Sequence, residues 1–230
     1  TSLVEVTEQE SHVLLSMDDG KVNALSFAML DALNGGLDRA AAAGKVVVIA
    51  GREGKFCAGF DLGVMAGRDA ETMRLLRTGA DLSARLMAFE TPVLLAVTGH
   101  ALAMGALLCL SADYRVGTRG PFKLGLNEAA IGMALPWFGI ELARARLAGN
   151  HLDQAIGVAR IYDPDNAVSA GFLDETVEPA QLSARVTQMA DAVAQLDMAA
   201  HRESKRRVRE PLFERWEEAL RRDFADFASP

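Results

Sequence analysis

The first third of the chain alternates short apolar runs with one amphipathic segment. Residues 3–6 and 12–17 have the apolar pattern of strands, and a polar turn at 18–20 follows them. Ser26 is a candidate N-cap for a helix. The apolar face expected for this helix consists of Phe27, Leu30, Leu33 and Leu37. The run VVVIAG after Lys45 is β-branched without polar alternation, which is typical of a strand covered on both faces.

A crossover unit is expected next. After the VVVIAG strand comes a loop at 52–61, REGKFCAGFD, with two glycines, and then a helix from about 69 to 89. Pro92 stops the helix, and a second buried strand covers 93–97. The order of strand, loop, helix and strand predicts a right-handed crossover with parallel strands, which is an α/β arrangement.

The most apolar stretch of the chain lies at 96–115, AVTGHALAMGALLCLSADYR. Small and apolar residues run to the first charge, Asp113, which predicts a buried helix far shorter than the roughly 20 residues that span a bilayer. Gly105 near its start allows close approach to the helix N-terminus, where free N–H groups and the helix dipole can hold an anionic oxygen. The alternative is a core helix whose glycine serves close packing only.

The two glycine-bearing loops are expected to face one pocket. The loops at 52–61 and 98–105 both follow the carboxyl end of a parallel strand, and ligands of open α/β sheets bind at that edge. If each loop offers one backbone N–H, the pair forms a hole for an oxygen that becomes negative during a reaction. Loss of one such donor typically costs about 3 kcal/mol of barrier.

Glu128 is the candidate for proton transfer. Its neighbours are apolar or small: Leu126, Ala129, Ala130, Ile131 and Met133. A carboxylate in an apolar pocket has a raised pKa and can act as a proton shuttle. A surface glutamate or a helix cap after Asn127 is the alternative interpretation.

The second half of the chain is expected to be mainly helical. Helices are predicted at 140–148, 151–160, 179–196 and 198–228, and the last of these is expected to break near Pro211. An apolar face on the last helix, of a kind that often packs on another subunit, consists of Leu212, Trp216, Leu220, Phe224 and Phe227. We therefore expect a catalytic core at 1–178 with an appended helical part at 179–230.

Composition narrows the range of partners. The chain has 230 residues, of which 50% are hydrophobic, enough for a substantial core. Its net charge of −7 argues against nucleic acid as the main partner, although one local basic patch exists, KRRVR at 205–209. Cys57 and Cys109 lack the spacing of a metal site or a disulfide framework, so no metal is expected. The first residues show no charged n-region followed by an apolar h-region, so we expect a cytoplasmic protein without membrane contact.

Three motifs in order resemble the crotonase (enoyl-CoA hydratase/isomerase) superfamily. KFCAGFDL at 55–62 resembles its first acyl-CoA loop, AVTGHALAMG at 96–105 its second, and NAVSAGFLDETV at 166–177 the segment before its C-terminal helices. The resemblance covers nearly the whole chain. It implies a crotonase-like ββα spiral with a C-terminal helical part used in trimerisation, a homo-trimer or hexamer, and an acyl-CoA substrate without a further cofactor.

The resemblance also implies roles for individual residues. The oxyanion donors would be the backbone N–H groups of Phe60 and Met104. The residues that would bind substrate are Lys55, Ala58, Gly59, Asp61, Gly105 and Leu107. Lys55 and Arg52 could meet CoA phosphates or stay solvated loop charges.

One departure from the family pattern favours a particular reaction. In hydratases of the family that use two catalytic glutamates, the first glutamate stands at the position that is Leu107 in this chain. The second glutamate matches Glu128. The segment LGLNEAAIGMALPWF is similar to that of the mitochondrial type of enoyl-CoA isomerase, in which one glutamate transfers the proton.

Hydration needs two polar groups, whereas moving a double bond from position 3 to position 2 needs one base. We therefore predict a 3-enoyl-CoA to 2-enoyl-CoA isomerase of fatty-acid metabolism. The alternatives are enoyl-CoA hydration, thioester hydrolysis, decarboxylation, or acyl-CoA binding without catalysis.

Overall fold

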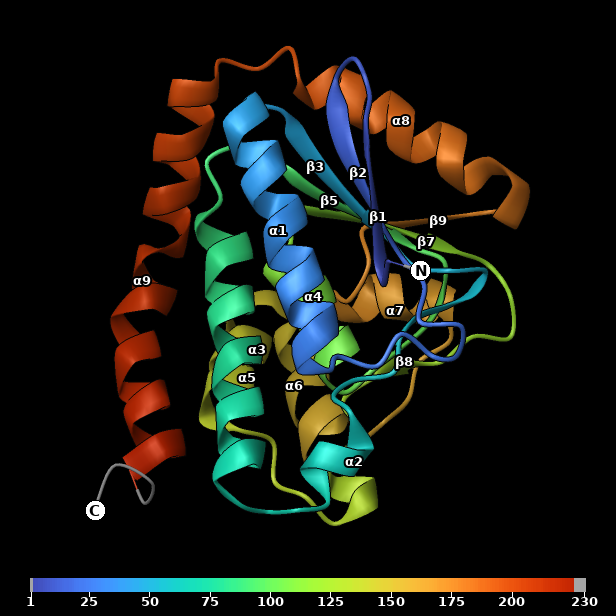
Figure 1. Ribbon diagram of the computed structural model, residues 1–230. Coiled ribbons are helices and arrows are strands. Elements are labelled where there is room, and N and C mark those ends of the chain that lie inside the picture. The colour runs from blue at the N-terminus through green and yellow to red at the C-terminus, as the bar shows by residue number, and fades with distance from the viewer. Residues whose placement is uncertain (1, 226–230) are drawn as a thin grey trace.

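A six-stranded sheet forms the centre of the molecule. The computed structural model describes residues 2–225, and the sheet has the order β1-β2-β3-β5-β7-β9 (Figure 1). Its strands are β1 (Val4–Glu8), β2 (His12–Met17), β3 (Val46–Ala50), β5 (Val93–Val97), β7 (Tyr114–Thr118) and β9 (Glu175–Val177). β1 is antiparallel to β2, and every other pair in the sheet is parallel.

A smaller parallel sheet lies beside the first. Its strands, in the order β4-β6-β8, are β4 (Gly54–Cys57), β6 (Gly99–Leu102) and β8 (Leu124–Gly125). The chain passes from the large sheet to the small one three times, from β3 to β4, from β5 to β6 and from β7 to β8, and then enters helical structure each time. This repeat confirms the predicted α/β fold and its ββα spiral.

Helices cover both faces of the large sheet, as the apolar runs predicted. Val47 and Ile49 belong to the main core with α1 (Phe27–Ala43), whereas Val46 and Val48 pack with α8 (Leu182–Val193) on the opposite face. Successive side chains of a strand point to opposite faces, so a continuous apolar run requires cover on both sides.

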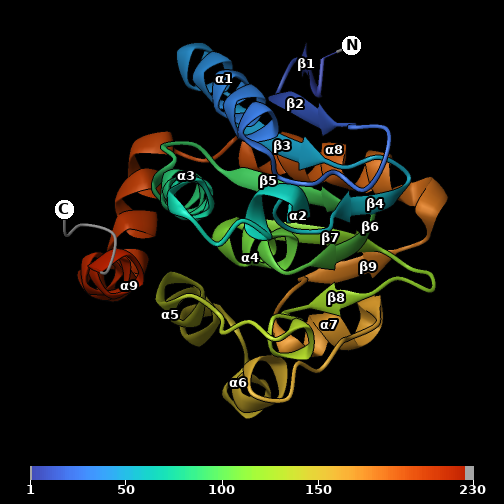
Figure 2. The same cartoon turned by 60° about the horizontal axis from the view of Figure 1, so that its bottom comes forward.

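The remaining helices surround the small sheet and the main core (Figure 2). They are α2 (Leu62–Met65), α3 (Ala70–Ala88), α4 (Met104–Ser111), α5 (Trp137–Arg146), α6 (Gly149–Ile156), α7 (Pro164–Ala170) and α9 (Met198–Phe224). Every residue of α4 is buried, so the prediction of a buried helix after the second loop is confirmed. Among residues 2–225, no helix combines the length and the apolar character needed to cross a membrane.

The predicted break near Pro211 is wrong. α9 runs without interruption from Met198 to Phe224, although a proline inside a helix removes one backbone hydrogen bond. Pro211 is exposed, and so is Arg207 four residues earlier, so the carbonyl without a partner is at the solvent-facing side of the helix. Residues 226–228 of the predicted helix, with Phe227, lie outside the described residues.

The apolar face of α9 is used within the chain. Leu212, Trp216 and Leu220 are buried in the main core, and α9 packs along α5 and α3. These three residues therefore do not form the subunit contact expected for them. The division between a core at 1–178 and a helical part at 179–230 stays a prediction.

Candidate active site

The first glycine-bearing loop is held by a neighbouring segment. The N–H of Ala58 donates to the carbonyl of Val22 (3.1 Å), the N–H of Leu25 donates to Gly59 (2.8 Å), and that of Asp61 donates to Leu25 (3.2 Å). The amide of Phe60, between these bonds, has no hydrogen-bond partner within residues 2–225. The segment 22–25 thus fixes the loop while leaving one donor available.

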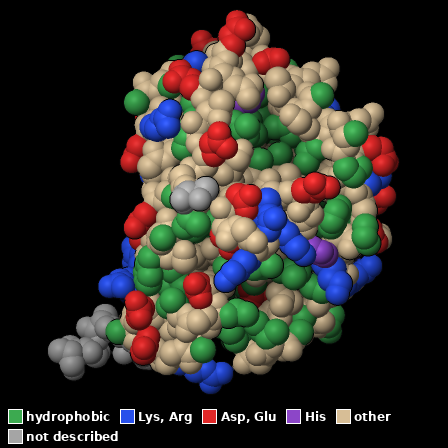
Figure 3. Space-filling model, turned by 45° about the vertical axis from the view of Figure 1, so that its right-hand side comes forward, with side chains coloured by type: hydrophobic (Ala, Val, Ile, Leu, Met, Phe, Trp, Pro, Cys, Tyr) green, Lys and Arg blue, Asp and Glu red, His purple; other side chains and the backbone are tan. Residues whose placement is uncertain are grey.

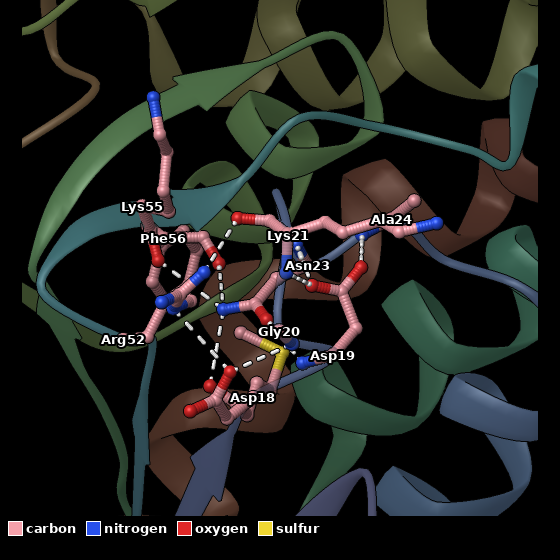
Figure 4. A network of polar contacts seen from close by, with 10 residues as sticks. Asp18, Asp19, Gly20, Lys21, Asn23, Ala24, Arg52, Lys55 and Phe56 are labelled. Atoms are coloured by element: carbon pink, nitrogen blue, oxygen red, sulfur yellow. Dashed lines mark hydrogen bonds and ion pairs between the residues drawn. The ribbon is translucent and has the colours of Figure 1, made fainter.

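A network of polar contacts around the buried Asn23 fixes segment 22–25 in turn (Figure 4). The carboxylate of Asp19 accepts from the N–H groups of Lys21 (2.7 Å), Asn23 (2.9 Å) and Ala24 (3.0 Å). Partial burial opposes ionisation of Asp19, but these backbone bonds outweigh it and lower its pKa.

The Asn23 side chain links this network to β4. It is fully buried, and its amide nitrogen donates to the carbonyls of Met17 (3.0 Å), Lys55 (3.2 Å) and Phe56 (3.2 Å). Asn23 holds a φ of +54°, which asparagine adopts more readily than most residues. The turn at 18–20 was predicted from the sequence, whereas the support that Asp19 and Asn23 give to the first loop was not.

The second loop turns sharply into α4. Ala103 has a φ of +50°, a strained value for a residue with a side chain, and its carbonyl accepts from the N–H groups of Ala106 (2.9 Å) and Leu107 (3.1 Å). Met104 is the first helical residue, and its amide has no partner in the described part of the chain. Strain at this position is consistent with a turn shaped for function.

Two glycines bring the loops together. Gly59 has a φ of +100°, and a Cβ there would lie 2.9 Å from the Cβ of Ala103 and 3.4 Å from the nitrogen of Met104. A Cβ at Gly105 would overlap the carbonyl oxygen of Cys57 at the end of β4. The predicted convergence of the two glycine-bearing loops is therefore confirmed.

A cavity of about 710 Å³ opens in front of these loops. Ala58, Phe60, Met104, Leu107 and Glu128 all line it. The other lining residues, mostly apolar, are Leu62, Met65, Ala66, Arg68, Thr72, Met73, Leu76, Ala103, Asn127, Ile131, Gly132, Met133, Ala134, Pro136 and Phe138. Apolar walls with a few convergent polar groups are the usual character of a small-molecule site.

Glu128 is the most unusual residue of the cavity. It is 8% exposed, its side chain caps no helix, and one carboxylate oxygen is buried without a hydrogen-bond partner within residues 2–225. Burial raises its pKa from 4.5 to about 7. The alternative interpretations as a surface glutamate or a helix cap are therefore wrong.

Lys55 and Asp61 lie outside the cavity lining. Asp61 caps α2 by accepting from the N–H of Gly63 (2.8 Å). Lys55 of β4 lies opposite His100 of β6 in the small sheet. Desolvation is the largest cause that lowers the pKa of His100, and the positive charges of Lys55 and Lys123 lower it further. On the face shown in Figure 3, Lys and Arg side chains gather around one histidine, next to an apolar area.

Asn127 is a cavity residue that sequence analysis assigned no role. It precedes Glu128, lines the cavity, and its side-chain oxygen is buried without a partner in the described residues. Its position directly before Glu128 was the sequence feature that could have indicated a role in the site. Within residues 2–225 no cluster of three or more His, Cys, Asp or Glu side chains could hold a metal ion.

Comparisons with known proteins identify the family and the fold. The family model described as enoyl-CoA hydratase/isomerase matches residues 7–229. A structure of an enoyl-CoA hydratase/isomerase family protein from Pseudomonas syringae is 37% identical, covers 96% of each chain and has a TM-score of 0.94.

The names of further relatives differ in the reaction they give. A Mycobacterium tuberculosis protein, 36% identical over 95% of this chain and 96% of its own with a TM-score of 0.91, is called an enoyl-CoA isomerase in one structure and a probable enoyl-CoA hydratase in another. Mouse mitochondrial enoyl-CoA delta isomerase 1 is 26% identical over 80% of this chain and 65% of its own. With its rat and human counterparts, the matches span 46% to 65% of these relatives' length.

Proposed function

The chain belongs to the enoyl-CoA hydratase/isomerase family, and we propose that it converts 3-enoyl-CoA to 2-enoyl-CoA with Glu128 as the proton shuttle. One observation carries the proposal: among the described residues, Glu128 is the only carboxylate that lines the cavity, and Leu107 lines it too at the position of the hydratases' other glutamate. A pKa of about 7 suits a group that must both accept and return a proton near neutral pH.

The proposed reaction uses one base twice. The Glu128 carboxylate takes a proton from C2, and the electron pair of the C–H bond moves toward the thioester oxygen to give a dienolate. The N–H groups of Phe60 and Met104 stabilise that oxygen, an effect typically worth about 3 kcal/mol per donor. The Glu128 carboxylic acid then returns the proton to C4, the double bond forms between C2 and C3, and Glu128 is again a carboxylate.

The cavity lining supports an aliphatic acyl chain as the substrate. Its walls are mainly methionine, leucine and alanine side chains, which suit a hydrocarbon chain of variable shape. We propose no cofactor beyond the CoA of the substrate. Assembly as a homo-trimer or hexamer and a cytoplasmic location stay predictions, and light scattering on the purified protein tests the first.

The experiment compares two substrates and one variant. A 3-enoyl-CoA and, separately, a 2-enoyl-CoA are incubated with the protein and with Glu128→Gln, and products are separated by chromatography and mass spectrometry. We expect the conjugated isomer from the 3-enoyl substrate, its loss in Glu128→Gln, and no addition of water to the 2-enoyl substrate. Persistence of isomerisation in Glu128→Gln would refute the assignment.

Hydration is the second candidate, and Asn127 favours it. The unpartnered oxygen of its side chain and that of Glu128 are both buried at the cavity. Together they offer two acceptors for a water molecule next to the substrate. A product heavier by one water from 2-enoyl-CoA, reduced in both Asn127→Ala and Glu128→Gln, would favour hydration over isomerisation.

A further inference from the structure

The last turns of α9 contact two of the helices that line the cavity, α3 and α5. Trp216 packs edge to face on Phe138 of α5, with 5.7 Å between ring centroids, and Phe138 is a fully buried residue of the cavity lining. The guanidinium of Arg77 on α3 lies 5.8 Å from the ring centroid of Phe224. α3 and α5 therefore both contact the same end of α9.

Asp223 makes the most specific of these contacts. Its two carboxylate oxygens accept from the backbone N–H groups of Trp137 (2.7 Å) and Phe138 (3.0 Å), at the first turn of α5. The N-cap residue of α5 is Pro136, whose side chain supplies no hydrogen bond. A residue 86 positions away along the chain thus accepts from two of the unpaired N–H groups at this helix terminus.

The start of α5 is also where the segment that carries Glu128 ends. Beyond one short turn at Ala129–Ile131, residues 132–136 form no helix or strand before α5 begins. Ile131 in this segment is 51% exposed, whereas Leu135 packs against the main core, so the segment is held chiefly by Leu135 and by its two ends. Its downstream anchor is the helix terminus that Asp223 caps.

We propose that Asp223 is a positioning residue for the active site: by capping α5 it fixes the downstream end of the segment 128–136 and hence the place of Glu128 in the cavity. This inference rests on the proposed function of Glu128. A misplacement of about 1 Å, even from a change far from the chemistry, can reduce turnover about 100-fold. The C-terminal helix would then support the active site of its own chain.

A matched pair of capping residues tests the proposal. Asp163 caps α7 by accepting from the N–H of Asn166 (2.9 Å), and it does not line the cavity. Asp163→Ala therefore removes a helix cap without touching the site. Asp223→Ala removes both bonds to α5, and Asp223→Asn keeps one acceptor oxygen.

The readouts separate positioning from stability. We expect kcat for the 3-enoyl-CoA to fall about 10- to 100-fold in Asp223→Ala and less in Asp223→Asn, and to change less than about twofold in Asp163→Ala at an equal folded fraction. Trp137 and Trp216, the two tryptophans of the chain, both lie at this contact, so their emission should change in the Asp223 variants and not in Asp163→Ala. Equal kcat in Asp223→Ala and Asp163→Ala would overturn the proposal.

Failure of the proposed function gives a different result. If the unmodified protein does not isomerise the 3-enoyl substrate, binding of a saturated acyl-CoA is measured through tryptophan emission. This measurement decides whether Asp223 anchors the cavity wall. Weakening of at least about fivefold in Asp223→Ala alone supports an anchored cavity wall. Equal affinity in the two variants overturns it whatever the reaction is.

Discussion

Replacing Glu128 by glutamine should reduce the loss of stability that the protein suffers as the pH rises. The folded protein binds a proton at Glu128 with a pKa of about 7, whereas the ordinary value is 4.5, and the cause is burial in the apolar cavity. Between these two values the folded chain keeps a proton that the unfolded chain has lost. Raising the pH therefore lowers the free energy of unfolding across this range.

The size of the effect follows from the two pKa values. Their difference is about 2.5, and each pH unit is worth about 1.36 kcal/mol. Burial of the ionised carboxylate therefore lowers the free energy of unfolding by about 3 kcal/mol above pH 7 and has no effect on it well below pH 4.5. At pH 5 the free energy of unfolding is lowered by about 1 kcal/mol. Glutamine cannot ionise, so the advantage of Glu128→Gln over the unmodified protein should grow by about 2 kcal/mol from pH 5 to pH 8.

Urea unfolding at pH 5 and pH 8 measures this change. The buried amide of the variant adds a cost that does not depend on pH, so the difference between the two pH values is the decisive quantity. Glu217→Gln removes a carboxylate from an exposed helix position and serves as the control. A stability gap between Glu128→Gln and the unmodified protein that is equal at both pH values would refute the desolvation argument.

Three further changes test how the site is supported. Gly59→Ala would put a Cβ 2.9 Å from the second loop at a φ of +100°, so kcat should fall at least about tenfold; unchanged turnover would mean that the loops need not touch. Asn23→Ala removes the donor to the β4 carbonyls and should lower the free energy of unfolding by about 1–3 kcal/mol, measured in urea, whereas an unchanged midpoint would contradict a structural role. Asp113→Ala would leave Lys205 and Arg209 buried without the carboxylate that lies 2.7 Å from each of them. Calorimetry should show that the free energy of unfolding falls by about 3–5 kcal/mol. Asp113→Asn should lose as much if charge is the cause, and less if the hydrogen bonds alone matter.

Elements with a strong local signal were predicted from the sequence. Ser26 caps α1 by accepting from the N–H of Met29 (3.2 Å), as its residue type predicted, and the helix expected from about residue 69 begins directly after its cap, Asp69. The strand after Lys45 was recognised because only a strand between two covered faces tolerates a continuous β-branched run. In each case the signal that identifies the element lies within a few consecutive residues.

Elements of the small sheet carry no such signal. β4 and β8 have four and two residues, and each includes a glycine, so the sequence pattern does not distinguish them from loops. β7, α7 and β9 were also not predicted as separate elements. The pairing of Leu25 with the first loop joins segments more than 30 residues apart, and a local pattern cannot reveal which partner a segment meets.

The two aspartates that support the site show where this limit lies. Asp19 and Asp223 play the same structural role. Each carboxylate accepts hydrogen bonds from backbone N–H groups and so holds a segment that supports the cavity. The partners of Asp19 lie two to five residues onward, so turn chemistry alone predicts them. Asp223 stands among charged residues of a helix and looks like any solvated carboxylate in the sequence. Its role depends on how α9 packs against α5, which makes it a test of whether the C-terminal helix contributes to catalysis.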